Sequence, residues 1–263
     1  MQCKNCKYEL FAENNYCPEC GAKVIKHRLT LRNIWHDISE KVLNLDNSLF
    51  KTFKHLLTQP GTVINDYIEG TRKKYVNVIQ YFAISLTLVG IQVFLINMFF
   101  KDSLIMDDTF SSLFATQANQ TENPFADSNI FIEINNYQSI IYILTLPISA
   151  ISTWLGFWVM NNRRLNFTEH VVLNLYYSAQ IIIITCFLSI VILCFGFNYF
   201  VVSSYLSILT IAYLFFVLKQ VFNMKFWNAL LHFLVTILFI GVGYVILMIF
   251  AGVVGVAYVL INQ

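Results

Sequence analysis

Charged residues are scarce in this chain of 263 residues, and their scarcity sets the class of protein. Lys, Arg, Asp and Glu together make up 12% of the sequence, whereas 57% of the residues are hydrophobic. The mean hydropathy is +0.61. These values lie outside the range of soluble globular domains. The composition therefore excludes an ordinary soluble domain and predicts a protein that crosses a membrane several times.

The sequence also lacks the motifs that usually carry enzyme chemistry. It contains no nucleophile elbow, no phosphate-binding loop and no paired carboxylates. None of its apolar runs has an Asp or Glu near the middle, and no inverted repeat or pair of interrupted runs is evident. Ion-coupled transporters usually need such features. The sequence therefore favours a non-enzymatic protein and disfavours an ion-coupled transporter.

Five long apolar runs follow residue 75. They cover about residues 76–100, 138–160, 171–197, 199–218 and 227–261. Each run is long enough for one transmembrane helix, which needs about 20 predominantly apolar residues. We therefore predict an all-α polytopic membrane protein, in which residues 76–263 form a domain of five transmembrane helices.

Basic residues are unevenly distributed along the chain. Residues 1–75 hold 12 of the 17 Lys and Arg residues, whereas residues 101–137 hold one Lys against six acidic residues. Basic loops are retained in the cytoplasm, so we expect a cytoplasmic amino terminus, an acidic external loop over residues 101–137 and an external carboxyl terminus. The membrane-flanking basic residues that share the predicted cytoplasmic side are Arg72, Lys73, Lys74, Arg163 and Arg164.

Two CxxC pairs near the amino terminus form the strongest local motif. Ten residues separate the two pairs, and Gly21 follows the last cysteine. Two such knuckles supply the four thiolates that zinc prefers, and glycine suits the positive φ that ends a knuckle. The cysteines are Cys3, Cys6, Cys17 and Cys20.

We therefore predict a zinc ribbon over residues 1–25 that holds one structural Zn²⁺ per chain. Four thiolates leave the ion no open position for catalysis. Two disulfides or unrelated free thiols are the alternatives. No apolar signal precedes the cysteines, so we expect a reducing compartment, which favours the metal site.

Residues 26–75 combine a basic linker with short amphipathic segments. Helical patterns cover residues 31–45, 49–57 and 63–68, and Gly70 closes the last of them. These segments are too short and too charged to span a bilayer. We expect juxtamembrane helices that either lie in the headgroup plane or pack under the spans, with a small soluble bundle as the alternative.

Polar residues, Gln180 among them, gather at the start of the third predicted span, and the candidate pocket group is Glu169, His170, Asn174 and Tyr177. The last three share one helical face at i, i+4 and i+7. That face can line a pocket that coordinates an ion or binds a lipid headgroup. The alternative is an interfacial helix end whose polar residues meet water. Isolated polar groups in the spans are expected to be interhelical hydrogen-bond partners: Gln80, Gln92, Asn97, Gln138 and His232.

Three motifs together resemble a bacterial family of zinc-ribbon membrane proteins known only as a domain of unknown function. They are the four cysteines, the segments Pro60-Gly61 and Tyr67-Ile68-x-Gly70-x-Arg72-x-x-Tyr75, and Phe167-x-Glu169-His170-x-Val172. The likeness covers about the first 82 residues and the start of the third span. It implies an integral protein of the bacterial inner (cytoplasmic) membrane and carries over no activity, substrate or catalytic residue. The five-span plan also resembles the Yip family, in architecture alone.

Two classes of function fit these observations. The first is a non-enzymatic inner-membrane scaffold or adaptor, in which the cytoplasmic ribbon docks a cytoplasmic or membrane protein partner to the five-span domain. The second is a transporter or lipid-handling protein with a polar pocket at the cytoplasmic start of the third span. The closed metal site and the uncharged spans favour the first. Besides the lipid bilayer and a protein partner, a homo-oligomer is left open, and nucleic acid is disfavoured because aromatic residues do not interleave with the basic ones.

Overall fold

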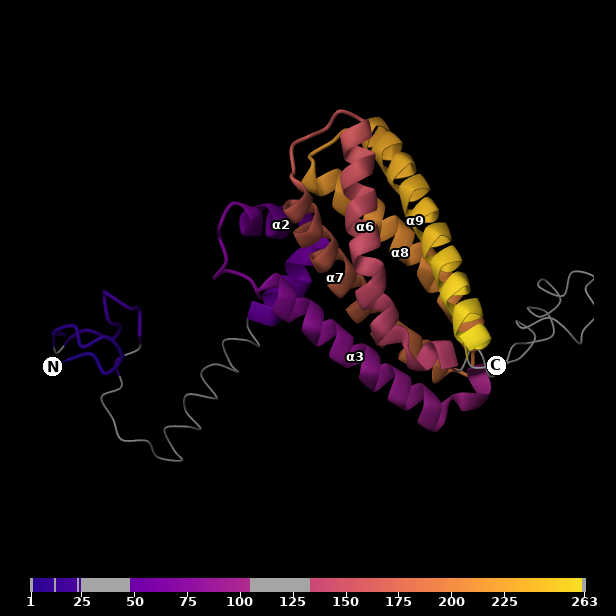
Figure 1. Ribbon diagram of the computed structural model, residues 1–263, viewed down its shortest axis with the longest axis horizontal. Coiled ribbons are helices and arrows are strands. Elements are labelled where there is room, and N and C mark those ends of the chain that lie inside the picture. The colour runs from indigo at the N-terminus through magenta and orange to yellow at the C-terminus, as the bar shows by residue number, and fades with distance from the viewer. Residues whose placement is uncertain (1, 12, 23, 25–47, 105–132, 262–263) are drawn as a thin grey trace, which may run out of the picture. The chain divides into compact units, whose positions relative to one another are not determined.

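The computed structural model describes residues 2–11, 13–22, 24, 48–104 and 133–261, drawn in Figure 1. The chain divides into two compact units, residues 1–47 and residues 48–263. The first unit contains an isolated antiparallel bridge between Gln2 and Glu9. The second is helical throughout its described elements, and no β-strand occurs among the described residues.

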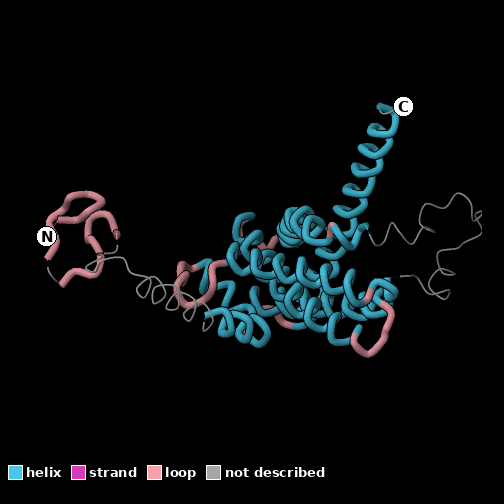
Figure 2. The backbone as a smooth tube through the Cα atoms, turned by 90° about the horizontal axis from the view of Figure 1, so that it is seen from below, coloured by secondary structure: helices cyan, strands magenta, loops and turns pink. Residues whose placement is uncertain are grey.

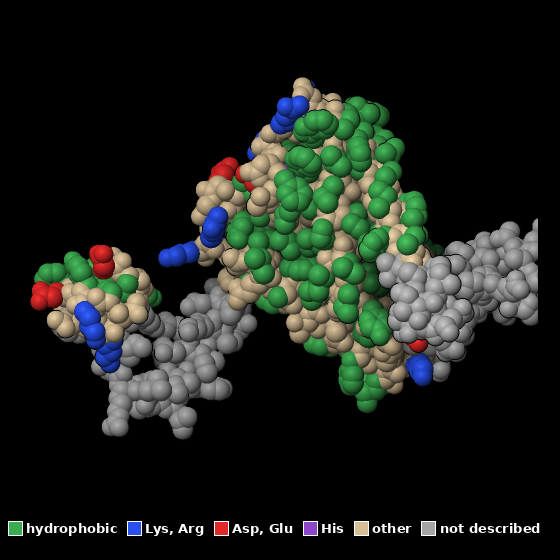
Figure 3. Space-filling view, viewed as in Figure 1, with side chains coloured by type: hydrophobic (Ala, Val, Ile, Leu, Met, Phe, Trp, Pro, Cys, Tyr) green, Lys and Arg blue, Asp and Glu red, His purple; other side chains and the backbone are tan. Residues whose placement is uncertain are grey.

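Five helices of the second unit are long and apolar enough to cross a membrane. They are α3 (Val78–Phe99), α6 (Gln138–Val159), α7 (Phe167–Leu193), α8 (Tyr199–Val221) and α9 (Phe226–Ile261). The predicted number of spans is therefore confirmed, and the helices indicate a multi-pass membrane protein. Figure 3 shows that hydrophobic side chains cover most of the visible face of this unit, as expected of a surface that meets lipid.

The first turn of α7 is more polar than the apolar run that predicts it. The helix begins at Phe167, four residues before the expected start at 171. Asn166 caps it, because its side-chain oxygen accepts a hydrogen bond from Glu169 N at 2.9 Å while the Glu169 carboxylate accepts one from Asn166 N at 2.7 Å. This reciprocal capping box satisfies two backbone groups and extends the helix into the polar segment.

Helix α7 lies at the centre of the bundle. It packs against α3, α6 and α8, and a second close pair is formed by α6 and α9. Two glycines lie where the backbones of α6 and α9 approach. A Cβ atom at Gly156 would lie 2.9 Å from the hydroxyl oxygen of Thr236, and one at Gly243 would lie 2.5 Å from a methyl carbon of Ile148. Small residues permit such contacts between membrane helices. The carboxyl-terminal part of α9 extends away from the other helices (Figure 2).

Two short helical segments precede the spans and belong to the same compact unit. Residues 48–58 are helical, and α2 covers Pro60–Ile68. Gly70 follows the end of α2 and has a φ of +101°. Gly70 N donates a hydrogen bond to Tyr67 O, and Thr71 N donates one to Asp66 O. This is the double hydrogen bond of a Schellman motif, which needs a residue with positive φ. The predicted closure at Gly70 is thus confirmed.

Other expectations lie wholly or partly outside the described residues. The expected helix over residues 31–45 is one of them. Of the expected acidic loop over 101–137, the structure describes a 3₁₀ turn, η1 (Lys101–Leu104), and residues 133–137.

Candidate functional site

The four cysteines of the ribbon converge on one point. Their Sγ atoms all lie within 4.8 Å of one another. Cys3 Sγ lies 3.7 Å from Cys20 Sγ, and Cys6 Sγ lies 3.5 Å from Cys17 Sγ. A tetrahedral ion with Zn–S bonds of about 2.3 Å separates its sulfurs by about 3.8 Å. The donor set and its spacing therefore fit a metal ion of the size of Zn²⁺.

The two knuckles are built in the same way. Lys7 N donates to Cys3 O at 2.9 Å, and Gly21 N donates to Cys17 O at 2.9 Å. The residue that ends each knuckle has positive φ, 65° at Lys7 and 69° at Gly21. The sequence predicts the positive φ at Gly21, whereas Lys7 is a residue that rarely adopts it. The repeat points both pairs of thiols toward one centre.

The surroundings of Cys3, Cys6 and Cys20 shift the pKa values of these thiols in different directions. Backbone N–H groups of the first knuckle hold the pKa of Cys3 below its usual value, and the Asn5 side chain together with backbone Ala22 lowers the pKa of Cys20 to about 6. The backbone N–H of Tyr8 also lowers the pKa of Cys6, but lost hydration and the neighbouring thiols outweigh it and raise the pKa to about 12. Four thiolates this close repel one another, so the fully ionised set requires a cation.

The ribbon displays three aromatic side chains on its surface. The exposed fraction is 46% for Tyr8, 80% for Phe11 and 61% for Tyr16. Its small core consists of Leu10 and two of the cysteines, with Ala22 and Val24 packed against it. The exposed aromatic residues therefore do not stabilise the core of the ribbon, and they are available to contact another molecule.

The polar residues at the start of α7 separate into different environments. His170 and Asn174 are buried, and both contact Thr153 of α6: the hydroxyl oxygen lies 3.2 Å from His170 Nδ1 and accepts from Asn174 Nδ2 at 2.8 Å. Asn174 Nδ2 also donates to His170 O at 2.8 Å. Asn174 Oδ1 is buried without a partner among the described residues. These contacts join α7 to α6.

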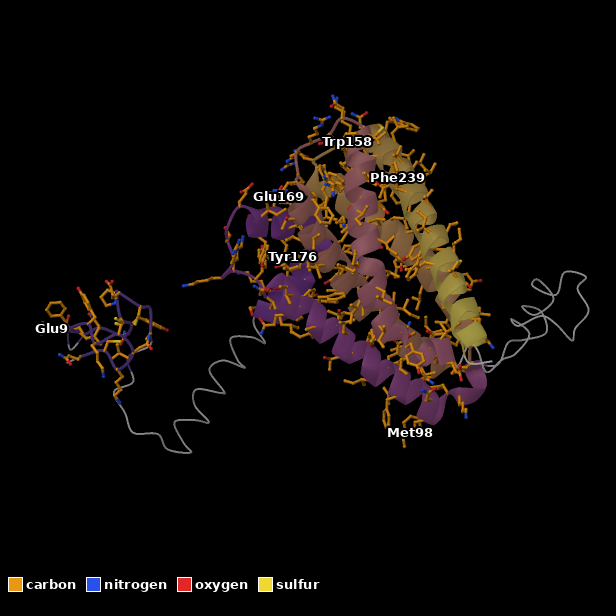
Figure 4. All side chains as sticks on the ribbon, viewed as in Figure 1. Glu9, Met98, Trp158, Glu169, Tyr176 and Phe239 are labelled. Carbon is orange, nitrogen blue, oxygen red and sulfur yellow. The ribbon has the colours of Figure 1, made fainter. Side chains whose placement is uncertain are left out.

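The other two residues of that group lie apart from this contact. Glu169 is held in the capping box at the helix start, and Tyr177 donates from its hydroxyl to Thr210 O of α8 at 3.1 Å. Figure 4 shows Glu169 at the amino-terminal end of α7 and Tyr176 farther along the same helix. The structure therefore brings together two of the four proposed pocket residues, and none of the four lines a described cavity.

A set of contacts that the sequence analysis missed joins residues 48–76 to the spans. Tyr213 of α8 donates to Leu56 O at 2.9 Å, and Gln220 Nε2 donates to Thr58 O at 3.4 Å. Both carbonyls lie in the last turn of the helical segment 48–58, where backbone acceptors have no partner within the helix. The spans thus supply the hydrogen bonds that the end of this helix requires.

Helix α7 contributes the rest of these contacts. Gln180 is fully buried, accepts from the Tyr81 hydroxyl and donates to Phe53 O at 3.3 Å. Tyr176 donates to Val76 O at 2.8 Å. Four span residues thus bond to backbone carbonyls of residues 48–76, and they are Tyr176, Gln180, Tyr213 and Gln220. We call this set of hydrogen bonds the juxtamembrane clamp. Only the polar character of the four residues in apolar runs marks them in the sequence.

The membrane-flanking basic residues lie at the clamp end of the bundle. Val221 O, at the end of α8, accepts from Arg164 at 3.0 Å and from Asn65 of α2 at 3.1 Å. Lys74 pairs with Asp66 at 2.7 Å, a contact that raises the pKa of Lys74. Figure 3 shows basic side chains along this side of the unit. Arg164 and Lys74, with the basic residues next to them in the chain, therefore lie at the same end of the bundle.

One segment of the chain is similar to a known family. Residues 46–90 match a family described as a protein of unknown function (DUF3667). The match covers residues 48–58, α2 and the first half of α3, and it includes neither the four cysteines nor residues 167–172. No curated protein and no solved structure matches the chain. The likeness to the Yip family therefore rests on the number of spans alone.

Proposed function

We propose that the protein is a membrane scaffold or adaptor without enzymatic activity, in which the ribbon docks a protein partner to the five-span unit. The observation that carries the proposal is the combination of four convergent cysteines with exposed aromatic residues on the same small unit. A metal held by four thiolates has no open coordination position, so its role is to fold the ribbon. The folded ribbon then presents Tyr8, Phe11 and Tyr16, residue types that anchor protein interfaces.

The same proposal includes the metal, the membrane and the orientation. The metal is one Zn²⁺ per chain, because four thiolates at this spacing suit it best. The membrane is the bacterial inner membrane, with the ribbon and the basic end in the cytoplasm and the carboxyl terminus outside. Support comes from the gathering of Arg72, Lys73, Lys74, Arg163 and Arg164 at one end of the bundle.

The juxtamembrane clamp also supports the adaptor role, because it joins the segment after the linker to the transmembrane helices. The linker that follows the ribbon leads directly into residues 48–58, and these are held by side chains from α7 and α8. A partner bound to the ribbon is therefore tethered to a segment that is part of the bundle and not merely adjacent to it. Residues 46–90, which match the family, contain that segment.

The test uses the full chain extracted in a mild detergent. We expect a stoichiometric protein partner with the wild type. Phe11→Ser should lose that partner and keep the metal, because Phe11 is 80% exposed and is not a ligand. Glu13→Ser is the matched control, since it changes a nearby exposed residue without removing apolar surface.

The double variant Cys3→Ser with Cys6→Ser should lose both the metal and the partner, because two of the four ligands are gone. Quantitative mass spectrometry measures the copurifying proteins, and elemental analysis measures zinc. If Phe11→Ser and the cysteine variant both retain the wild-type set of proteins, the docking role of the ribbon is wrong.

A lipid-handling role is the second candidate, and one observation favours it. Asn174 Oδ1 is a buried acceptor without a partner among the described residues, close to His170 and Thr153. A buried unpaired acceptor costs about 1–3 kcal/mol unless water or a ligand satisfies it. A lipid that copurifies with the wild type and is lost in a folded Asn174→Leu variant would support this candidate over the adaptor.

A further inference from the structure

A cavity of about 200 Å³ with both polar and apolar lining residues lies between α3, α6, α7 and α8. Gln138 and Tyr199, which line it, are the first residues of α6 and α8, so the cavity reaches the end of the bundle opposite the basic residues. Thr210, another lining residue, lies eleven positions beyond Tyr199 on α8. At 1.5 Å per helical residue, the cavity extends about 16 Å into the bundle.

The lining contains several hydrogen-bonding side chains but no charged one. Its hydrogen-bonding residues include Gln92, Gln138, Tyr142, Ser189, Ser203 and Ser207. No Lys, Arg, His, Asp or Glu lines the cavity. An ion in such a site would lose its hydration without gaining a counter-charge, which is strongly unfavourable in a membrane interior. A neutral molecule with several hydrogen-bonding groups avoids that cost.

Most hydroxyl groups in the lining already donate their hydrogen to a backbone carbonyl, so towards a ligand they can act only as acceptors. Thr185, Ser203, Ser207 and Thr210 each donate to a carbonyl of their own helix at 2.7–2.9 Å. A hydroxyl that has donated its only hydrogen can still accept. Gln138 Oε1 adds a buried acceptor that has no partner among the described residues. The cavity therefore offers several acceptors to a molecule that can donate.

The other lining residues indicate what else a bound molecule should contain. The Tyr142 hydroxyl accepts from Gln138 Nε2 at 3.4 Å, and its own hydrogen has no acceptor among the described residues, so it supplies a donor. Ile182 and Leu206 form an apolar side that can pack against C–H groups. The volume is several times the roughly 30 Å³ that one water occupies in the liquid. Hydroxyl groups on a carbon skeleton match all three features.

We propose that this cavity binds an uncharged polyhydroxyl group of the size of a glycerol or a single sugar. The group can belong to a free polyol or to the headgroup of a neutral glycolipid. The proposal does not depend on the ribbon or on the adaptor role, because every lining residue lies in the spans.

The test compares two neighbouring serines of α8 in the full-length protein. Ser203 and Ser204 donate to the same carbonyl, Phe200 O, at 2.9 and 2.8 Å, but only Ser203 lines the cavity. Ser203→Leu should fill the cavity and weaken binding by roughly tenfold or more, whereas Ser204→Leu should bind as the wild type does. Thr210→Val removes one acceptor at nearly constant volume and should weaken binding by roughly two- to tenfold, even if Ser203→Leu does not fold.

Two probes distinguish the sources of the group. Free glucose is measured by saturation-transfer NMR in phosphatidylcholine nanodiscs, and monoglucosyl diacylglycerol is measured by native mass spectrometry. Binding of glucose assigns the site to a free polyol, and binding of the glycolipid alone assigns it to a lipid headgroup. The proposal is overturned if neither probe binds, if Ser203→Leu and Ser204→Leu weaken binding equally, or if the folded variants at residues 203 and 210 bind as the wild type does.

Discussion

Gly61 allows α2 to lie against the end of α8, and replacing it should open the juxtamembrane clamp. A Cβ atom at Gly61 would lie 2.6 Å from Gln220 O and 2.7 Å from Gln220 C. Both are backbone atoms in the last turn of α8, so they cannot rotate away as a side chain would. Gly61→Ala must therefore push α2 away from α8 and strain the bond from Asn65 to Val221 O. Overpacking of this kind typically costs about 1–3 kcal/mol.

Hydrogen exchange is the assay for this prediction, because the damage should be local. A local opening made easier by about 1–3 kcal/mol exchanges roughly 5- to 150-fold faster. We expect faster exchange in the amides of residues 60–70 and little change in the carboxyl-terminal half of α3. Gly90→Ala is the matched control, since a Cβ there meets nothing within 4 Å and alanine favours helix. Unchanged exchange over residues 60–70 in Gly61→Ala would refute the close approach of α2 and α8.

Three further predictions concern the metal, the topology and the polar residues of α7. Cys3→Ser removes one of four ligands, so elemental analysis should find the zinc lost while the spans still insert, and retention of the full zinc content would contradict the four-cysteine site. A cysteine introduced at Glu133 should react with an impermeant reagent in intact cells and one at Asn162 should be protected, whereas the reverse pattern would invert the proposed orientation. His170→Ala and Asn174→Ala each break buried bonds worth about 0.5–1.5 kcal/mol, so both should lower the unfolding temperature in detergent, and unchanged temperatures would argue against a packing role.

The sequence predicts the spans well because hydrophobic length is a local property. Helix α3 begins and ends within two residues of the apolar run over 76–100, and α6 does the same over 138–160. Helix α7 begins four residues before its apolar run, and the reason is physical. Its first turn is polar, and the cap at Asn166 stabilises it by hydrogen bonds that a hydropathy average does not register.

Polar partners inside the bundle are not a local property, and the sequence predicts them poorly. His170, Asn174 and Tyr177 do share a helical face, but Tyr177 lies about 10 Å farther along the axis than His170. At that depth the neighbouring helix is different, because His170 meets Thr153 of α6 whereas Tyr177 meets Thr210 of α8. Spacing within one helix shows which residues face the same way, and it does not show which helix lies opposite.

The lack of charged residues in the middle of the spans explains why the clamp is made of tyrosine and glutamine. Without ion pairs, the polar attraction between helices in a membrane must come from uncharged hydrogen bonds, and the strongest free acceptors are carbonyls at helix ends. The helical segment 48–58 offers such carbonyls at Leu56 and Thr58, and Tyr213 and Gln220 occupy them. Apolar contacts alone would let residues 48–58 shift along α8 at little cost in free energy. The hydrogen bonds from Tyr213 and Gln220 fix the position at which this segment meets α8. Residues 48–58, which these bonds hold against α8, lie within the segment that matches the family.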